Sequence, residues 1–350
     1  GMYLRSLEYF RGIAIVFIVA GHCYILSDWQ FPTVLERSVA NVLTSSTALF
    51  VFVSGFLFHH VFYPRFNYIK FMKKKLRNVL APYLFFSLFG ITYALAVHGP
   101  YPEFFFGPGD SWWDRFLRPS LLYLLTGAEI WAYWYIPFIM IVFAFSPLFT
   151  LYIKTSLVIR LSLLAALLLF AMFLQRPPDN LLVAQSVFFY TPVYLAGILA
   201  SQNRQQLHAL FDKREGWLLV GAAILALVQA YTYTGAGSMH AAPFTWNGLD
   251  INILQKLLLS LFFMLYLHRF ENRHVSLLTT LAQASFAIFF IHCWIVLALI
   301  PVLQPLYRAV SLHPLPALVL NVLLVLFLSY LLAALIKRLL PNTSKMLIGW

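Results

Sequence analysis

The chain has 350 residues, of which 61% are hydrophobic and only 10% are charged. Soluble globular proteins carry about 45–50% apolar and about 25% charged residues, so this composition excludes a soluble globule and predicts a polytopic membrane protein. Two cysteines are too few for a disulfide scaffold. The formal net charge of +12 is explained by cytoplasmic loops and anionic lipid, so we expect the lipid bilayer as a partner and no nucleic acid.

Ten apolar runs are long enough to cross about 30 Å of hydrocarbon, at about 20 residues each. They lie near residues 8–27, 41–62, 79–98, 131–152, 158–175, 183–201, 216–234, 251–268, 279–304 and 315–336. The stretches between them are short, so we expect one all-α transmembrane domain over residues 1–350. Glu8 and Arg11 interrupt the first run, which favours a retained span over a cleaved signal peptide.

The distribution of Lys and Arg predicts the orientation. If the N-terminus is cytoplasmic, ten spans place both termini there and leave six basic residues on the opposite side or its helix ends, against eighteen on the cytoplasmic side. The six are Arg37, Arg115, Arg118, Arg176, Lys256 and Arg308. The longest loop, 99–130, is rich in proline and contains Trp112 and Trp113, which is typical of an outward interfacial segment with aromatic anchors.

Two histidines interrupt otherwise apolar runs: His22 in the first and His292 in the ninth. Ionisable groups in hydrocarbon are costly, so such residues are functional candidates. Arg11 and His22 are eleven residues apart, which places them within about 20° on one helix face and about 16 Å apart along the axis. The alternative is structural, with Arg11 binding lipid phosphate and each histidine bonded to a neighbouring helix.

These residues carry a resemblance to a known family. The segment YFRGIAIVFIVAGHC, with ten residues between Arg11 and His22, resembles the first-helix signature of the acyltransferase-3 family of membrane acyltransferases. LFVFVSGFLF at 49–58 is similar to its Phe-x-x-Ser-Gly-Phe segment, and KKKLRNVLAPY at 73–83 is similar to its Arg-x-x-Arg element. In the latter, Lys74 takes the first arginine position and Arg77 the second.

Two later segments extend the resemblance over nearly the whole chain. AYWYIPFIM at 132–140 resembles the family's Trp-Phe segment, with Tyr135 in place of the usual Phe. SFAIFFIHCWIV at 285–296 is similar to the Ser-Tyr-x-x-Tyr-Leu-x-His segment, with Phe286 and Phe289 replacing the tyrosines.

The resemblance implies an enzyme that transfers an acyl group, most often acetyl from cytoplasmic acetyl-CoA, to a hydroxyl of a cell-surface or periplasmic glycan or a lipid-linked sugar. It implies location in the bacterial inner (cytoplasmic) membrane. Independently, the phosphates of an acyl-CoA need a cationic site, and Lys70, Lys73, Lys74 and Arg77 have the spacing of one helical face. We expect Lys74 and Arg77, together with Arg11, to bind this donor. The structural alternative is a juxtamembrane cluster that sets topology and holds anionic lipid.

His22 is the candidate general base, because a neutral imidazole can accept the proton of an attacking hydroxyl. A covalent acyl-histidine is the competing version, and the sequence does not separate the two. His292 is expected to support catalysis by positioning His22, the acceptor or the thioester oxygen, with Ser285 seven residues earlier on nearly the same face.

Four further residues are candidates for binding the acceptor: Ser54, Glu129, Trp134 and Asp250. Ser54-Gly55 could instead bring two helices close together, and interfacial aromatics and solvated carboxylates would explain the others. The His22-Cys23 and His292-Cys293 pairs do not predict a metal site, because adjacent helical residues point about 100° apart. We expect no metal cofactor.

Two other functions fit the same spans. A transporter or permease could use the histidines in a proton relay, although the sequence contains no evident internal repeat. The third interpretation is a protein that only carries the acyl group across the membrane, while a separate periplasmic acyltransferase completes the transfer.

Overall fold

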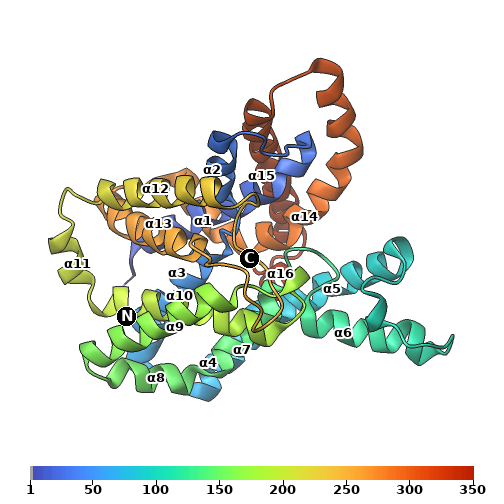
Figure 1. Cartoon of the computed structure of the whole chain (residues 1–350). Helices are drawn as coiled ribbons and strands as arrows, with labels where there is room; N and C mark the ends of the chain where they lie inside the picture. The colour runs from blue at the N-terminus through green and yellow to red at the C-terminus, as the bar shows by residue number, and fades with distance from the viewer. Residues whose placement is uncertain (1–2) are drawn as a thin grey trace.

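The computed structural model describes residues 3–350, with the side chain of His98 left out. The chain is all-α, and the described residues contain no strand beyond one isolated bridge between Arg176 and His240. The helices up to α8 are α1 (Arg5–Cys23), α2 (Val34–Leu43), α3 (Thr47–Leu57), α4 (Tyr68–Lys75), α5 (Ala81–Tyr93), α6 (Arg118–Thr126), α7 (Tyr135–Ala144) and α8 (Ser146–Lys154) (Figure 1). The remainder are α9 (Leu157–Leu174), α10 (Val183–Gln202), α11 (Arg204–Leu210), α12 (Gly216–Thr232), α13 (Asn252–Tyr266), α14 (Ser276–Val310), α15 (Pro314–Leu339) and α16 (Ser344–Ile348).

The predicted membrane architecture is confirmed, with a smaller number of full-length spans. Eight helices among the described residues are long and apolar enough to cross a membrane, or nine if the pair α7–α8, bent by 56°, is one span. All ten apolar runs coincide with helices, but the run at 216–234 folds into α12, an apolar helix of 17 residues. The structure therefore has fewer full-length spans than the ten apolar runs, because hydropathy does not register a bend or a short helix.

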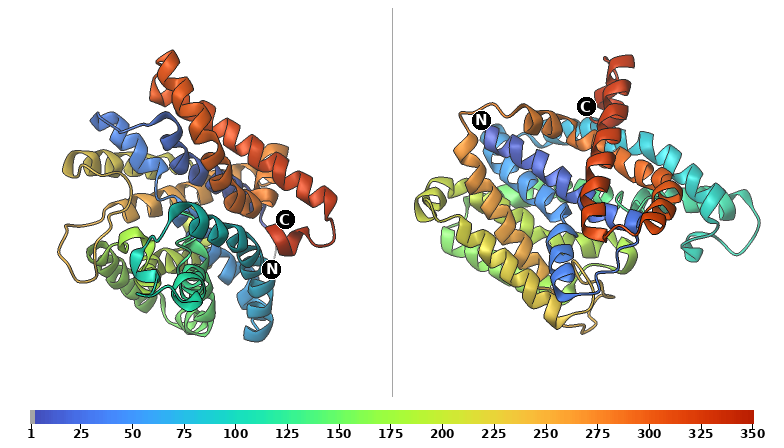
Figure 2. Two further views of the ribbon diagram at one scale, coloured as in Figure 1. Left: turned by 90° about the vertical axis from the view of Figure 1, so that its right-hand side faces the viewer. Right: turned by 90° about the horizontal axis from the view of Figure 1, so that it is seen from above.

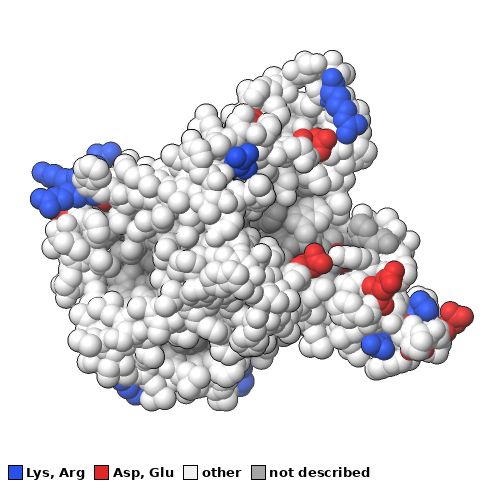
Figure 3. Space-filling model, viewed as in Figure 1, with Lys and Arg blue, Asp and Glu red and all other residues white. Residues whose placement is uncertain are grey.

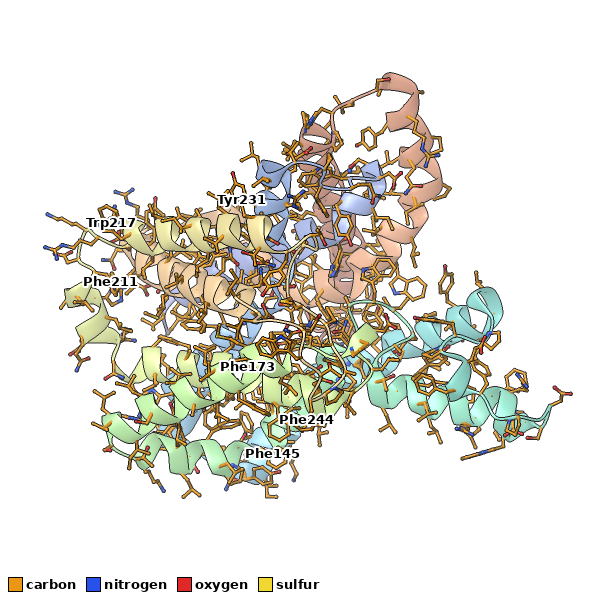
Figure 4. The ribbon with its side chains drawn as sticks, in the orientation of Figure 1. Phe145, Phe173, Phe211, Trp217, Tyr231 and Phe244 are labelled. Carbon is orange, nitrogen blue, oxygen red and sulfur yellow. The ribbon has the colours of Figure 1, made fainter. Side chains whose placement is uncertain are left out.

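The ends of α12 have exposed aromatic side chains. Trp217 is 71% and Tyr231 73% exposed, and Figure 4 shows them near opposite ends of the helix. Fourteen residues of helix separate them by about 21 Å, and aromatic residues at both ends of a span are typical of membrane interfaces. Most of the molecular surface in Figure 3 carries no Lys, Arg, Asp or Glu, and its charged side chains gather toward the margins.

The core is built around α1, which packs against α14, α15 and α3. Two small residues allow a second close crossing, between α3 and α10: a Cβ on Gly55 would collide with the carbonyl oxygen of Tyr194, and one on Gly197 with that of Phe52. Gly55 therefore has the helix-packing role that the sequence offered as an alternative for Ser54-Gly55. Ser54 remains on the side of α3 that faces a cavity.

Two arms extend from this core, as Figures 1 and 2 show. One consists of the C-terminal half of α14 with the start of α15, and the other of α5, α6 and their connection. The second arm contains the predicted interfacial loop, which is partly helical, and its Trp112 and Trp113 are exposed. In the view from above, both ends of the described chain lie along the same edge of the molecule (Figure 2).

Candidate functional site

The two intramembrane histidines meet in the core. His22 is near the C-terminal end of α1, His292 lies within α14, and their Nδ1 and Nε2 atoms are 2.9 Å apart. The rings are stacked with centroids 5.1 Å apart. His292 is fully buried and His22 is half-buried. Residues separated by 270 positions thus form one site.

The surroundings of His292 determine how protons are arranged in the neutral pair. Its Nδ1 is 2.7 Å from the carbonyl oxygen of Phe289 and 3.1 Å from that of Ile288. Carbonyl oxygens only accept hydrogen bonds, so Nδ1 carries the proton and Nε2 is an acceptor. His22 must then donate from its own Nδ1, which leaves its Nε2 unprotonated. No partner for that Nε2 is found in the described part of the chain.

A cavity of about 380 Å³ is lined by Arg11 and Ser285, which precede the histidines on α1 and α14. We call it the basic cavity, because its lining includes Arg11, Lys74, Lys75 and Lys345 and no acidic residue. Arg11 donates from Nη2 to the carbonyl oxygen of Ala282 at 3.3 Å, and its Nε has no partner. The other lining residues are Phe50, Val53, Ser54, Leu57, Phe62, Asn78, Val79, Tyr135, Ile139, Phe143, Ser285, Phe286 and Gly349.

A second depression, of about 470 Å³, adjoins the basic cavity. This basic groove is lined by Lys73, Lys74, Arg77, Asn78, Asn342, Lys345 and Met346. It shares Lys74, Asn78 and Lys345 with the basic cavity, so the two spaces are contiguous. Asn67 caps α4 by accepting a hydrogen bond from the backbone N–H of Lys70, and α4 presents Lys73 and Lys74 to the groove.

A third cavity, of about 340 Å³, has a different lining. We call it the aromatic cavity; it is lined by Ala94, Tyr101, Tyr123, Gly127, Ala128, Glu129, Ile130, Trp131, Trp134, Asp179 and Asn180. Its residues come in part from the α5–α6 arm, which borders a hollow in the surface (Figure 3). Trp131 also contacts His22, edge to face, with ring centroids 6.5 Å apart.

The order of residues along four elements places the histidine pair between the basic and aromatic cavities. On α1 and α14, Arg11 and Ser285 line the basic cavity and the histidines follow further along each helix. The segment containing α5 lines the basic cavity at its start, with Val79, and the aromatic cavity at its end, with Ala94. At α7 the order along the chain is reversed: Trp134, just before the helix, lines the aromatic cavity, and Tyr135, Ile139 and Phe143 line the basic cavity.

Glu129 is a buried acid in the aromatic cavity. It is 3% exposed; its Oε1 accepts a hydrogen bond from Ser87 at 2.8 Å, and its Oε2 has no partner. Burial raises the pKa of Glu129 to about 7. Buried polar atoms are normally satisfied, so the free oxygen is a place for a hydroxyl or water.

Trp134 is buried in the same wall and stacks on Tyr190, with ring centroids 5.7 Å apart. Of the acceptor candidates, Trp134 and Glu129 line the aromatic cavity, whereas Ser54 lines the basic cavity. Asp250 lies in neither. Its carboxylate is fully buried, and one oxygen accepts a hydrogen bond from the backbone N–H of Asn252 at 2.9 Å. The structure thus divides the four candidates among three places.

Arg176 is a candidate that the sequence interpretation missed. It is 6% exposed, its guanidinium lies 4.5 Å from the ring centroid of Trp134, and it donates to Asn180 at 2.7 Å. Its Nε has no partner. The signal available in the sequence was an arginine on the side expected to hold few basic residues. Lys75, which was not among the predicted site residues, lines the basic cavity among aromatic rings. Lys70 lines none of the three spaces.

Within the described residues, no group of three or more His, Cys, Asp or Glu side chains is placed to hold a metal ion. Cys23 and Cys293 are free and buried. The Sγ of Cys293 lies 3.6 Å from His292 Nε2, so the nearest sulfur contacts one histidine only.

Comparison with known proteins identifies the family of the chain. A family model described as an acyltransferase domain, that of the acyltransferase-3 family, matches residues 4–338. No curated protein and no solved structure gives a significant match. The match covers nearly the whole chain and confirms the resemblance carried by the five sequence segments.

Proposed function

Because the chain belongs to the acyltransferase-3 family, it is an acyltransferase, and we propose that it transfers acetyl from acetyl-CoA to a hydroxyl of a cell-surface or periplasmic glycan. It is a multi-pass membrane protein. We place it in the bacterial inner membrane, with the basic groove toward the cytoplasm, where the donor is found. The identities of the donor and acceptor and the roles of individual residues go beyond the family assignment.

The observation that carries the proposal is the position of the histidine pair between two spaces of opposite chemistry. The basic groove and basic cavity suit a phosphate-bearing donor, because their linings hold cations and no carboxylate. The aromatic cavity suits a sugar, because Trp131, which is 39% exposed, can pack its ring against the sugar, and the carboxyl groups of Glu129 and Asp179 can accept hydrogen bonds from the sugar hydroxyls. A donor and an acceptor bound there would meet at His22.

In the proposed step, the unprotonated Nε2 of His22 takes the proton of the acceptor hydroxyl as its oxygen attacks the thioester carbonyl carbon. The carbon–sulfur bond then breaks, the acyl group remains on the acceptor oxygen, and the imidazolium returns its proton to the CoA sulfur. His292 holds the tautomer of His22 that this step requires. An acyl-histidine version uses the same nitrogen as nucleophile and hands the acyl group on in a second transfer.

The test is His22→Ala in purified protein, with acetyl-CoA and extracted glycans as substrates. We expect CoA affinity by isothermal titration to stay near the wild-type value, because His22 lies about 16 Å along α1 from Arg11. Acyl transfer should fall by about 10²–10⁴-fold. The matched control is His59→Ala, since His59 is also in a membrane-spanning segment but bonds to Ser201 at 2.7 Å, away from the pair.

Near wild-type transfer by a correctly folded His22→Ala protein would disprove the assignment. The same samples separate the competing functions. A permease would neither hydrolyse acetyl-CoA nor acylate a glycan, and a protein that needs a separate periplasmic acyltransferase would consume acetyl-CoA without modifying the glycan.

A further inference from the structure

Lys345 has a position that none of the predicted donor residues except Lys74 shares. It lines both the basic groove and the basic cavity, where the two spaces join. It comes from α16, near the C-terminal end of the chain, whereas Lys74 comes from α4. The two lysines, residues 74 and 345, are therefore far apart in the sequence but line the same junction.

The segment 344–350 is fixed by packing. Ser344 and Ile348 are buried, and α16 packs against α5 and α15. Trp350 contacts Tyr330 and lies 4.3 Å, centroid to Nζ, from Lys337. Lys345 is on the exposed side of this anchored helix, so its ammonium group is held beside the groove by the helix that carries it.

Gly349 allows the segment to close against α14. Its φ is +83°, a left-handed conformation that favours glycine, and a Cβ at this position would come within 2.7 Å of the Phe286 ring. Gly349 and Phe286 both line the basic cavity. The segment is therefore a wall of this cavity as well as a support for Lys345.

The charges of the two contiguous spaces are unbalanced. Their linings contain six cations and no acidic residue: Arg11, Lys73, Lys74, Lys75, Arg77 and Lys345. None of the six has a carboxylate within 4 Å in the described residues. Like charges gathered at one site repel one another, and an anion with several charges relieves that repulsion.

We propose that segment 344–350 completes the donor site and that Lys345 binds a phosphate of the CoA nucleotide. This inference rests on the proposed function. A lipid headgroup has the same phosphate chemistry, but the site has more cations than one headgroup phosphate would neutralise. It also adjoins a cavity lined by Arg11 and Ser285, from the two helices that carry the histidines.

The experiment measures CoA binding to purified full-length protein by isothermal titration. Lys345→Ala should weaken binding by about tenfold, the loss expected for one hydrogen bond to a charged group. Lys345→Arg should retain most of the affinity, because the charge stays. Gly349→Val should also weaken binding, because it displaces the wall without removing a charge. The control is Arg338→Ala, which removes a nearby exposed charge that lines neither space.

The outcomes separate this inference from the proposed function. If the wild type binds CoA and Lys345→Ala binds it equally well, the role of Lys345 is wrong and the proposed function stands. If the wild type binds no CoA, both fail. A parallel titration in nanodiscs, with and without phosphatidylglycerol, tests the lipid. Loss of phosphatidylglycerol binding in Lys345→Ala, with CoA binding unchanged, would assign the lysine to lipid and overturn the proposal.

Discussion

His292 determines which nitrogen of His22 is unprotonated and therefore available for the proposed role of general base. The carbonyl oxygens of Ile288 and Phe289 fix the proton on His292 Nδ1. His292 Nε2 is then an acceptor, so the 2.9 Å contact requires the proton of His22 to be on its Nδ1. A histidine without such a neighbour would divide its population between two tautomers, of which one presents a proton where a base is needed.

This predicts different results for two substitutions of His292. His292→Ala removes the acceptor for His22 Nδ1 and should lower kcat by about 10–100-fold, a loss typical of residues that orient a functional histidine. His292→Gln should recover part of the rate, because its amide oxygen can accept from Nδ1. Steady-state kinetics should show little change in KM for acetyl-CoA. Equal rates for the two variants would contradict the orienting role.

Glu129 predicts a pH dependence of stability. Burial raises its pKa from 4.5 to about 7, so the folded state holds the proton more tightly than the unfolded state. The stabilisation is complete below pH 4.5 and is lost as pH rises through about 7, for a total of about 3 kcal/mol. Glu129→Gln, which stays neutral, should flatten this fall in a thermal-denaturation series in detergent.

Asp250 supplies the control for that series. Burial also raises its pKa to about 7, so it adds a fall of the same sign over a similar range. Glu129→Gln should remove part of the fall, and the double variant with Asp250→Asn should remove a larger part of it. A slope unchanged by Glu129→Gln would show that this carboxylate is ionised in the folded protein at neutral pH.

The apolar runs predicted where the helices lie but not where each helix begins and ends. Every apolar run contains a helix, yet the third span begins at Tyr68, eleven residues before its apolar run, because basic α4 continues through a π-helical turn into α5. The run at 131–152 is bent where Ala144 ends α7 and Ser146 begins α8. Hydropathy averages composition over a window, so it does not detect such breaks.

The basic cluster illustrates what helical spacing could and could not predict. Spacing placed Lys73, Lys74 and Arg77 together, and all three line the basic groove. The same reasoning could not find Lys345 or Arg176, because each reaches its site through contacts with residues far away in the sequence. The histidine pair was accessible for another reason: each histidine is the exceptional residue in its own apolar run.

The basic groove leads to a prediction about donor affinity. Replacing Lys74 and Arg77 together with Ala should weaken CoA binding, and wild-type affinity should fall as salt rises, because ions screen charge pairing at an exposed site. Turnover at saturating acetyl-CoA should suffer less, since contacts made equally in ground and transition states change KM. Lys70→Ala is the control, as Lys70 lines neither basic space. Normal CoA binding by the double variant would leave the cluster as a topology anchor.

For the whole molecule, the expected orientation gives the three spaces their roles. Under the proposed function, the basic groove faces the compartment that contains acetyl-CoA, and the aromatic cavity faces the compartment that contains the glycan. Both ends of the described chain lie along one edge, as expected for the even number of crossings that the sequence predicts (Figure 2). The distribution of Lys and Arg predicts that this edge faces the cytoplasm. The helical packing alone would serve either orientation, so this assignment rests on the sequence.

Cysteine labelling on intact cells tests the orientation. Ser111 lies in the α5–α6 arm and Asn342 beside the basic groove, and both are exposed. The native Cys23 and Cys293 are fully buried, so they should contribute little background. A membrane-impermeant thiol reagent should label Ser111→Cys on intact cells and Asn342→Cys only after permeabilisation. Labelling of Asn342→Cys alone would invert the molecule and place the cationic groove on the side without CoA, which would also remove the basis for the proposed donor site.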